Sequence, residues 1–359
     1  MRRLLAAVTL IAVVSVGAIA ASPAIARKAP KEFFGLVPQN SISDADVERM
    51  SRGKVGTARV GVIWPAVEPT DDQFDFAATD ELIGDFAAAG IRPVANLSGV
   101  PRYVDPDPLA LPVDSASEKE QWKEFVAAFT NRYGEGGTYW TTAYPTQHPG
   151  AAPLPVNTIQ IWNEQNGPKH VDKPNPGLYA ELIRISHDAI SAEDPSAEVL
   201  LGGMFGRPKG GGGIKAWTFL KRMYASAGFK ESFDAVALHP YDPNIKGITG
   251  QIEKIRKTLK KKKDKGKELW MTELGYGSSK KGRLGVGKKK QAKLLKNSFK
   301  LLLKNRGKWK VGGVQWYTWR DLPAGESPCD WCTSAGLFNA AGTKAKPAWK
   351  QFVKFTGGS

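Results

Sequence analysis

The chain alternates short apolar runs with segments of helical periodicity eight times, and this alternation constrains the fold more than any other feature. Short runs rich in β-branched residues predict buried strands, whereas apolar residues at spacings of three and four predict helices. The predicted strands are Phe33–Val37, Thr57–Ile63, Arg92–Leu97, Thr158–Trp162, Glu198–Gly202, Ala235–His239, Glu268–Thr272 and Gly313–Thr318. Eight strand–helix units in strict order favour the α/β class, as a single (β/α)8 TIM barrel spanning residues 27–359.

Helical patterns fill the intervals between these strands, and several begin at residues that cap helices well, such as Ser43 and Ser115. The longer loops follow the third strand (98–117), precede the fourth (134–156) and follow the eighth (320–345). The active site of such barrels is built by the loops that follow the strands. The predicted helices are Asp44–Arg52, Ala77–Ala89, Glu118–Tyr133, Pro176–Ala192, Ile214–Ala227, Thr249–Lys263, Lys288–Lys304 and Lys346–Phe355.

Residues 1–26 have the features of a secretory signal peptide rather than of a folded element. Arg2 and Arg3 precede an apolar stretch over 4–21, and Ala24-Ile25-Ala26 offers a cleavage site after Ala26. We therefore expect a secreted protein, extracellular or associated with the cell envelope, with no membrane segment after cleavage. An uncleaved anchor is the alternative, because the stretch is just long enough to span a bilayer.

The only two cysteines, Cys329 and Cys332, are spaced C-x-x-C. In a secreted chain this pair predicts a disulfide that fixes a loop. A zinc site would need two further ligands, and no histidine lies near the pair in sequence. A thioredoxin-like centre would place the pair at a helix start in a much smaller fold.

The net charge is +16, or +14 once Arg2 and Arg3 leave with the signal peptide, and much of the excess lies in 254–267 and 280–293. A solvated helix face is the plain interpretation of these lysines. The more specific interpretation is that these lysines attract an acidic polysaccharide or an anionic cell envelope. No specific nucleic-acid partner is expected, because no recognition motif accompanies the lysines and aromatic residues do not alternate with them.

Two glutamates follow predicted strands. Glu164 comes after Thr158–Trp162, and Glu273 comes after Glu268–Thr272. A carboxylate in such a position is costly to hold unless chemistry or a partner uses it. Cleavage of a glycosidic bond also uses two carboxylates, one as the acid and one as the nucleophile or base.

Other candidate residues follow or lie on the predicted strands, so they would converge on the same mouth. Asn163 can bind a sugar hydroxyl, and Tyr241 and Arg59 can hydrogen-bond a carboxylate and keep it ionised. Each could instead have a structural role: His239 as a core histidine, Arg59 as the partner of an acid in the barrel. Trp162 and Glu68 fit structural roles better. The predicted substrate-binding set is Arg59, Asn163, His239, Tyr241, Trp316 and Trp319.

No metal and no cofactor are expected. The chain contains neither G-x-S-x-G nor H-E-x-x-H. Residues 282–289 approach a phosphate-binding loop but lack its final Ser or Thr.

Asn163-Glu164 at strand four, His239-Pro240-Tyr241 at strand six and Thr272-Glu273 at strand seven resemble the clan A retaining glycoside hydrolases. Together with 64–69 they are similar to family 39 and related endoglycosidases. One departure is Gln165, which stands where proline often follows the strand-four glutamate.

The resemblance implies that Glu164 is the general acid/base and Glu273 the nucleophile, with their carboxyl groups about 5–5.5 Å apart. It also implies that Asn163, His239 and Tyr241 line the site and that Trp316 or Trp319 stacks on the sugar. As the acid, Glu164 would need a raised pKa, which the charge of Glu273 would supply. The expected partner is a carbohydrate, with an acidic polysaccharide as one candidate. An inactive carbohydrate-binding barrel and a basic envelope protein that binds polyanions are the alternative functions.

Overall fold

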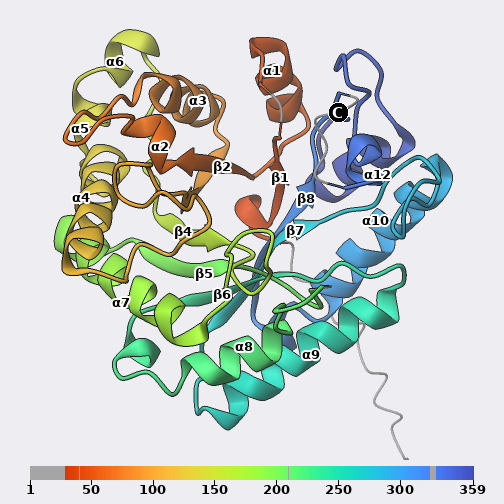
Figure 1. The fold of residues 1–359 in the computed structure, drawn as a ribbon. Helices are drawn as coiled ribbons and strands as arrows, with labels where there is room; N and C mark the ends of the chain where they lie inside the picture. The colour runs from red at the N-terminus through yellow and green to blue at the C-terminus, as the bar shows by residue number, and fades with distance from the viewer. Residues whose placement is uncertain (1–28, 40, 209, 324–328) are drawn as a thin grey trace, which may run out of the picture.

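The computed structural model describes residues 29–39, 41–208, 210–323 and 329–359, which form a closed barrel of parallel strands inside a ring of helices (Figure 1). Each strand pairs with the next in sequence, and β1 pairs with β8 to close the barrel. The predicted (β/α)8 barrel is therefore confirmed. The strands are β1 (Phe34–Val37), β2 (Thr57–Ile63), β3 (Arg92–Ser98), β4 (Thr158–Asn163), β5 (Glu198–Phe205), β6 (Ala235–His239), β7 (Glu268–Leu274) and β8 (Val311–Tyr317).

The longer helices cover the outside of the barrel, and the short ones lie in its loops. Ser43 caps α1 through a reciprocal pair of hydrogen bonds with Asp46, and Ser115 caps α4 by accepting from the Glu118 amide, as the sequence pattern predicts. The helices are α1 (Asp44–Arg52), α2 (Trp64–Val67), α3 (Ala77–Ala88), α4 (Ala116–Tyr133), α5 (Thr138–Thr141), α6 (Tyr144–Gln147), α7 (Pro176–Glu193), α8 (Ala216–Met223), α9 (Ile245–Lys261), α10 (Lys288–Lys304), α11 (Arg306–Trp309) and α12 (Pro347–Thr356).

The predicted bounds differ from the observed ones where side chains outside the periodic pattern decide the ends. Helix α9 begins at Ile245, four residues before the predicted start, because the side chain of Asn244 caps it by accepting from the Gly247 amide. Strand β7 continues to Leu274, so Glu273 lies within the strand rather than after it. The segment predicted as a loop over 134–156 contains the one-turn helices α5 and α6.

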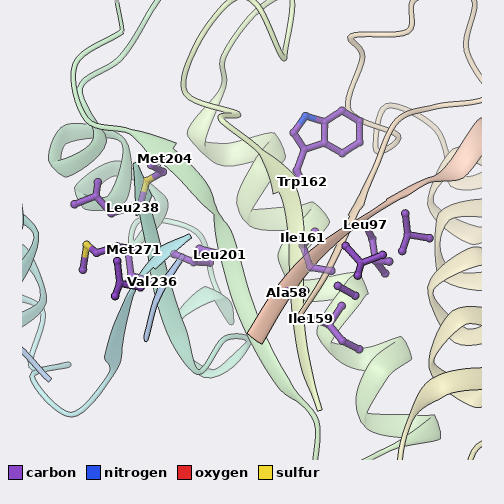
Figure 2. Packing of buried hydrophobic residues seen from close by; sticks show 14 of the residues in the cluster. Ala58, Leu97, Ile159, Ile161, Trp162, Leu201, Met204, Val236, Leu238 and Met271 are labelled. Carbon is purple, nitrogen blue, oxygen red and sulfur yellow. The ribbon is translucent and has the colours of Figure 1, made fainter. Parts of the chain in front are cut away.

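The core has two parts because successive strand residues face opposite sides of the barrel wall. Aliphatic side chains such as Ala58, Ile161 and Leu238 face outward and pack under the helices (Figure 2). Inside the barrel, a separate cluster consists of Val94, Leu200, Ala235 and Trp270. Burying each large apolar side chain contributes about 1.5–3 kcal/mol, which makes this wall a rigid frame for a polar site.

In the described part of the chain, no helix is both long enough and apolar enough to cross a membrane.

Candidate active site

The two glutamates meet at the mouth of the barrel, where the strands end. Glu164 directly follows β4, and Glu273 is the penultimate residue of β7. One oxygen of each carboxylate and one ring nitrogen of His239 all lie within 4.8 Å of one another. Carboxylates this close are compatible with a retaining glycosidase, whose two carboxyl groups lie about 5–5.5 Å apart.

The end of β4 departs from regular strand geometry, and this departure aims its polar side chains. Trp162 and Glu164 have positive φ angles of 67° and 46°, a conformation that costs about 1–3 kcal/mol for residues other than glycine. Trp162 is buried, and its ring lies 6.0 Å from that of Trp122 in α4. Because Trp162 turns outward into the core, Asn163 turns inward to the site. Trp162 is thus a core residue, as predicted.

Glu273 is held by two hydrogen-bond donors, one for each carboxylate oxygen. Arg59 Nη1 lies 2.7 Å from Oε1, and Tyr241 Oη lies 2.8 Å from Oε2. Burial, followed by the charge of Glu273, raises the pKa of Tyr241 well above its ordinary value, so the phenol keeps its proton and donates it. The pairing between β7 and β8 shifts register between Met271 and Leu274, and such irregularities re-aim side chains beside active sites.

Arg59 is buried, and its guanidinium connects three strands. Besides Glu273, its Nη2 donates to Asn163 Oδ1 at 2.7 Å and to Asn96 Oδ1 at 3.1 Å. Gln160 also donates to the Asn96 oxygen, at 2.5 Å. Arg59 is therefore both the partner of an acid in the barrel and a neighbour of the site, so the two interpretations of this residue describe one arrangement.

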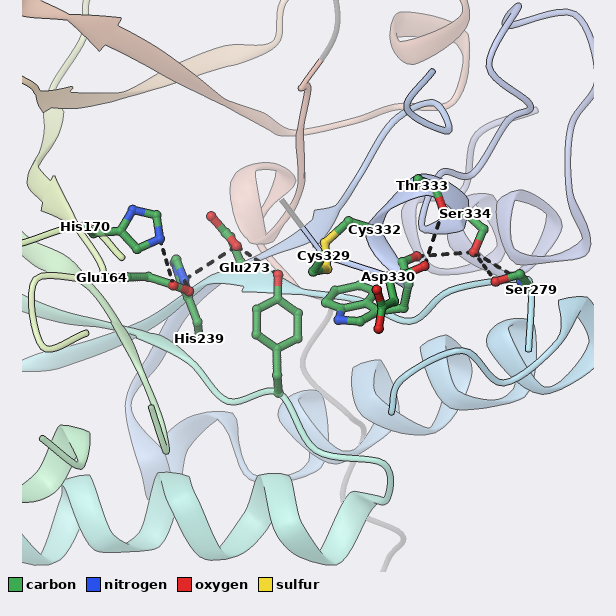
Figure 3. The surroundings of a disulfide bond; sticks show 12 residues. Glu164, His170, His239, Glu273, Ser279, Cys329, Asp330, Cys332, Thr333 and Ser334 are labelled. Carbon is green, nitrogen blue, oxygen red and sulfur yellow. Dashed lines mark hydrogen bonds and ion pairs between the residues drawn. A yellow bond between two sulfur atoms is a disulfide. The ribbon is translucent and has the colours of Figure 1, made fainter. Parts of the chain in front are cut away.

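Glu164 accepts hydrogen bonds from two imidazoles. His239 Nδ1 lies 2.8 Å from its Oε1, and His170 Nε2 lies 3.2 Å from its Oε2 (Figure 3). Burial raises the pKa of Glu164, but the hydrogen bonds from His170 and His239 outweigh burial and lower the pKa to about 2. The expectation of a raised pKa, based on the nearby charge of Glu273, is therefore wrong, because it took no account of the two imidazoles.

His170 is a residue that sequence reasoning missed. It lies in the loop after β4, where its carbonyl accepts from Trp162 Nε1 at 3.1 Å, and its side chain is 37% exposed. Burial lowers the pKa of His170, but its hydrogen bond to Glu164 and the charges of Glu164 and Glu273 outweigh burial and raise the pKa; Arg59 opposes them weakly. The available signal was its position six residues after Glu164 in a chain with only four histidines.

His239 is fully buried at the end of β6 and lies between the two carboxylates. Its Nδ1 lies 3.5 Å from Glu273 Oε2, in addition to its contact with Glu164, and its Nε2 lies 3.2 Å from Thr272 Oγ1. Together with Arg59, Asn163 and Tyr241, this histidine completes the group of predicted residues that the structure brings together.

Trp316 and Trp319 are not at the site surface. Both are fully buried: Trp316 packs against Tyr276 and Phe299, and Trp319 Nε1 donates to Asp46 at 2.9 Å. Neither indole can present a face to a sugar, so the prediction of a stacking platform at these positions is wrong. Position at the end of β8 was the only basis for it, and the helices outside β8 cover both rings.

A different indole, Trp331, lies beside Tyr241, which donates to Glu273. It is partly buried between Cys329 and Cys332, and its ring centroid is 5.1 Å from that of Tyr241. The two cysteines form a disulfide with an S–S distance of 1.97 Å, which confirms the predicted pairing (Figure 3). The disulfide closes the four-residue loop that carries Trp331, so it limits the positions that this indole can take. The sequence signal that could have identified Trp331 as a site residue was its position between two paired cysteines after the eighth strand.

The residue types of the site could also hold a metal, since Glu164, His239 and Glu273 offer ligand atoms within 4.8 Å of one another. Their surroundings argue against this use. Arg59 already neutralises Glu273, and Tyr241 and the imidazoles occupy the carboxylate oxygens that a cation would need. The site is therefore better suited to acid–base and nucleophilic chemistry.

Glu68 lies outside this group. It has the structural role in its loop that the sequence predicts, because its carboxylate accepts a hydrogen bond from Trp64 Nε1 at 2.6 Å.

Comparison with protein families finds a similarity over part of this chain. Residues 195–346 match the family described as Glycosyl hydrolase catalytic core, a segment that contains His239, Tyr241 and Glu273 but not Glu164. No curated protein sequence matches the chain at a significant level. Residues 195–346, less than half of the chain, are thus similar to a glycosyl hydrolase catalytic core, in agreement with the resemblance seen in the motifs.

Solved structures share the fold at low sequence identity. A family 39 glycoside hydrolase from Bacteroides cellulosilyticus WH2 has a TM-score of 0.67 at 18% identity, over 92% of this chain and 64% of that one. A family 39 β-xylosidase from Caulobacter crescentus has a TM-score of 0.64 at 17% identity, over 92% and 72%. The exo-β-1,4-mannosidase Op5Man5 from the Opitutaceae bacterium strain TAV5 has a TM-score of 0.61 at 17% identity, over 91% and 59%. This chain therefore spans less than two thirds of the first and the last of these three proteins.

Proposed function

We propose that this chain hydrolyses a β-linked glycoside with retention of anomeric configuration. Glu273 is the nucleophile and Glu164 the acid/base. The observation that carries the proposal is the convergence of these carboxylates within 4.8 Å, each in a different hydrogen-bonding environment. The β-linkage is supported by the β-xylosidase and β-mannosidase named among the similar structures.

The surroundings of the two carboxylates divide the roles between them. Glu273 is fixed by Arg59 and Tyr241, neither of which gives up a proton readily, so its carboxylate is held as a nucleophile. Glu164 instead contacts His170 and His239, and an imidazole nitrogen can give a proton to a carboxylate and take it back. An acid/base residue must gain and lose a proton in each cycle, which suits Glu164.

In the first step, a Glu273 oxygen bonds to the anomeric carbon while the bond to the leaving oxygen breaks, and that oxygen takes a proton from Glu164. In the second step, Glu164 takes a proton from water as the water oxygen attacks the anomeric carbon and releases Glu273. His170 supplies the proton of the first step through its 3.2 Å contact with Glu164 and takes it back after the second.

Retention can be tested by proton NMR of a β-glycoside during hydrolysis. We expect the β anomer to be the first sugar product, followed by slow mutarotation. The α anomer as the first product would show inversion and would rule out a covalent intermediate on Glu273.

Replacing His170 with Asn should move the alkaline limb of the pH profile of kcat/KM to lower pH, by about one unit or more. In the parent, the proton shared by the pair rests on His170, whose pKa is raised, and it is lost only as pH rises through that value. In the variant the proton must rest on Glu164, a group of lower pKa. The matched control is His187→Asn, a partly exposed histidine of α7 beside Asp188, which should leave the profile unchanged. An unchanged limb in His170→Asn would exclude this role.

Replacing Trp331 with Ala should raise KM about tenfold while changing kcat less, because the indole would lose stacking on a bound sugar but takes no part in bond breaking. Steady-state kinetics of Trp331→Ala and Trp331→Phe measure this, with Phe expected to restore most of the affinity. If KM stays the same and kcat falls, Trp331 supports Tyr241 rather than the substrate.

We propose a carbohydrate substrate and no particular sugar at the cleaved bond. The lysine-rich segments 254–267 and 280–293 contribute none of the residues that contact Glu164 or Glu273, so they give no support for an acidic sugar at that bond. Secretion is likewise proposed from the sequence pattern of residues 1–26, which lie outside the described residues.

An inactive carbohydrate-binding barrel is the rival function. It is disfavoured because both carboxylates are present and hold the separation that retaining hydrolysis needs. Binding of a glycan by the parent, with no release of sugar from it, would favour the rival.

A further inference from the structure

The charge of this chain is strongly segregated along the sequence. Residues 245–310 contain 23 Lys and Arg but only 4 Asp and Glu, a net charge of +19. The rest of the chain from residue 29 onward contains 24 basic and 31 acidic residues, a net charge of −7. The high overall charge is therefore not a general property of the surface: it belongs to the part of the wall that contains α9, α10 and α11.

Helix α10 carries seven of these 23 basic residues in an ordered form. Its seven lysines are all exposed and it contains no acid. Seven other residues of the helix are buried: five are apolar, and two, Gln291 and Ser298, are polar. Five of the lysines recur at spacings of four, three, four and four and so share one face along about 22 Å of helix. This lysine stripe consists of Lys289, Lys293, Lys296, Lys300 and Lys304.

The stripe is unfavourable for the isolated protein. Like charges at these spacings destabilise a helix by about 0.2–0.5 kcal/mol per pair. Lys288, Lys289 and Lys290 occupy the first turn, where the helix dipole disfavours cations and where no acid is present. Within the described part of the chain, no lysine of the stripe lies within ion-pair distance of a carboxylate. Repulsion of this kind would be relieved by an anionic partner.

The neighbouring helix enlarges the basic surface. Helix α9 packs beside α10 on the outer wall of the barrel (Figure 1) and adds the exposed residues Lys254, Lys257, Lys260 and Lys261. Both helices lie outside the ring of strands, whereas Glu164 and Glu273 lie at its mouth. The basic surface is therefore separate from the site that contains the proposed catalytic residues.

We propose that the exposed lysines of α9 and α10 form a docking surface for an acidic polysaccharide, independent of the active site. A row of lysines along one helix, with further exposed lysines on its neighbour, suits a linear polymer that carries many carboxylates. Lys ammonium groups act as mobile point charges, whereas nucleic-acid surfaces add Arg and aromatic residues that stack on bases. A membrane surface would favour apolar side chains among the cations, and the large exposed apolar residues of the described chain are Ile63, Phe74, Tyr103 and Leu178, none of them on these helices.

The test is binding of the catalytically blocked Glu273→Gln protein to immobilised polygalacturonate at several salt concentrations. We expect binding that weakens steeply as salt rises. Replacing Lys289, Lys293, Lys296 and Lys300 together with Gln should weaken it about tenfold or more. The matched control replaces four exposed lysines elsewhere, Lys54, Lys173, Lys230 and Lys344, and so removes the same charge. It should weaken binding less than about twofold.

Three results would overturn the proposal. The first is an equal loss of binding in both quadruple variants, which would show that only net charge matters. The second is no loss of binding in the α10 variant, and the third is tighter binding to phosphatidylglycerol vesicles or duplex DNA than to polygalacturonate at the same salt. Because Glu273→Gln is used throughout, the outcome does not depend on the proposed hydrolysis. In the otherwise unaltered protein, the α10 variant should keep its turnover of a small neutral substrate.

Discussion

Replacing Glu273 with Gln should abolish hydrolysis, lowering kcat about 10⁴-fold, or about 5 kcal/mol of transition-state stabilisation. The amide keeps the shape of the side chain and can still accept from Arg59 or Tyr241 through its oxygen. It cannot form the covalent bond to the anomeric carbon. Rates of sugar release from the most active β-glycan, with circular dichroism to confirm folding, measure this effect.

The control for Glu273→Gln is Glu268→Gln, because Glu268 begins the same strand β7 at the opposite end and is exposed. This variant should retain the parent rate within about twofold. A folded Glu273→Gln protein that keeps more than about a tenth of parent activity would show that another group is the nucleophile.

Replacing Glu164 with Gln should have an effect that depends on the leaving group. For a sugar leaving group, which must be protonated as it departs, kcat/KM should fall about 10³-fold. For an aryl glycoside with an acidic phenol, kcat/KM should fall less than about tenfold, because that phenol departs without protonation. The kcat of the variant on this aryl glycoside should still fall, since water must be activated in the second step.

Comparing the two substrates in the same variant separates catalysis from folding, because misfolding would affect both equally. An equal loss of kcat/KM for both would contradict the role of Glu164 as general acid. A fall restricted to the aryl glycoside would also contradict it.

The sequence predicts the barrel well because the fold depends on repeated signals. Eight apolar runs, each with a helical segment after it, specify the parallel barrel regardless of errors of a few residues at each end. The convergence of Glu164 and Glu273 could be predicted for a related reason: in this fold the ends of β4 and β7 must face the same mouth. The residues that hold Glu273, Arg59 on β2 and Tyr241 after β6, follow from the same geometry.

The rest depends on contacts that periodicity does not encode. Strand alternation would place Trp162 inside the barrel and Asn163 outside it, and the positive φ of Trp162 reverses both. His170 reaches Glu164 because Trp162 donates to its carbonyl, a contact between β4 and the loop that follows it. Trp316 and Trp319 end the eighth strand, as a stacking residue would, but α10 and α12 cover them with Phe299 and Trp349. The folding of the loop after β8 put Trp331 beside Tyr241 instead.

The pKa of Glu164 shows most clearly what the sequence alone leaves out. The expectation of a raised pKa rested on one neighbour, Glu273, and the structure adds two imidazoles that lower it. We therefore expect the pair formed by His170 and Glu164 to hold its shared proton mainly on the histidine. Since the pKa of His170 is raised in the folded protein, its ion pair with Glu164 stabilises the fold at acidic to neutral pH and is lost as pH rises through that raised pKa.

The most direct test of the central claim is release of reducing sugar by the mature protein from a panel of β-linked polysaccharides, neutral and acidic, measured beside Glu273→Gln and Glu268→Gln. The account predicts release from at least one polysaccharide, lost in Glu273→Gln and kept in Glu268→Gln. Release that persists in folded Glu273→Gln, or no release from any polysaccharide by a parent protein that binds one of them, would contradict it.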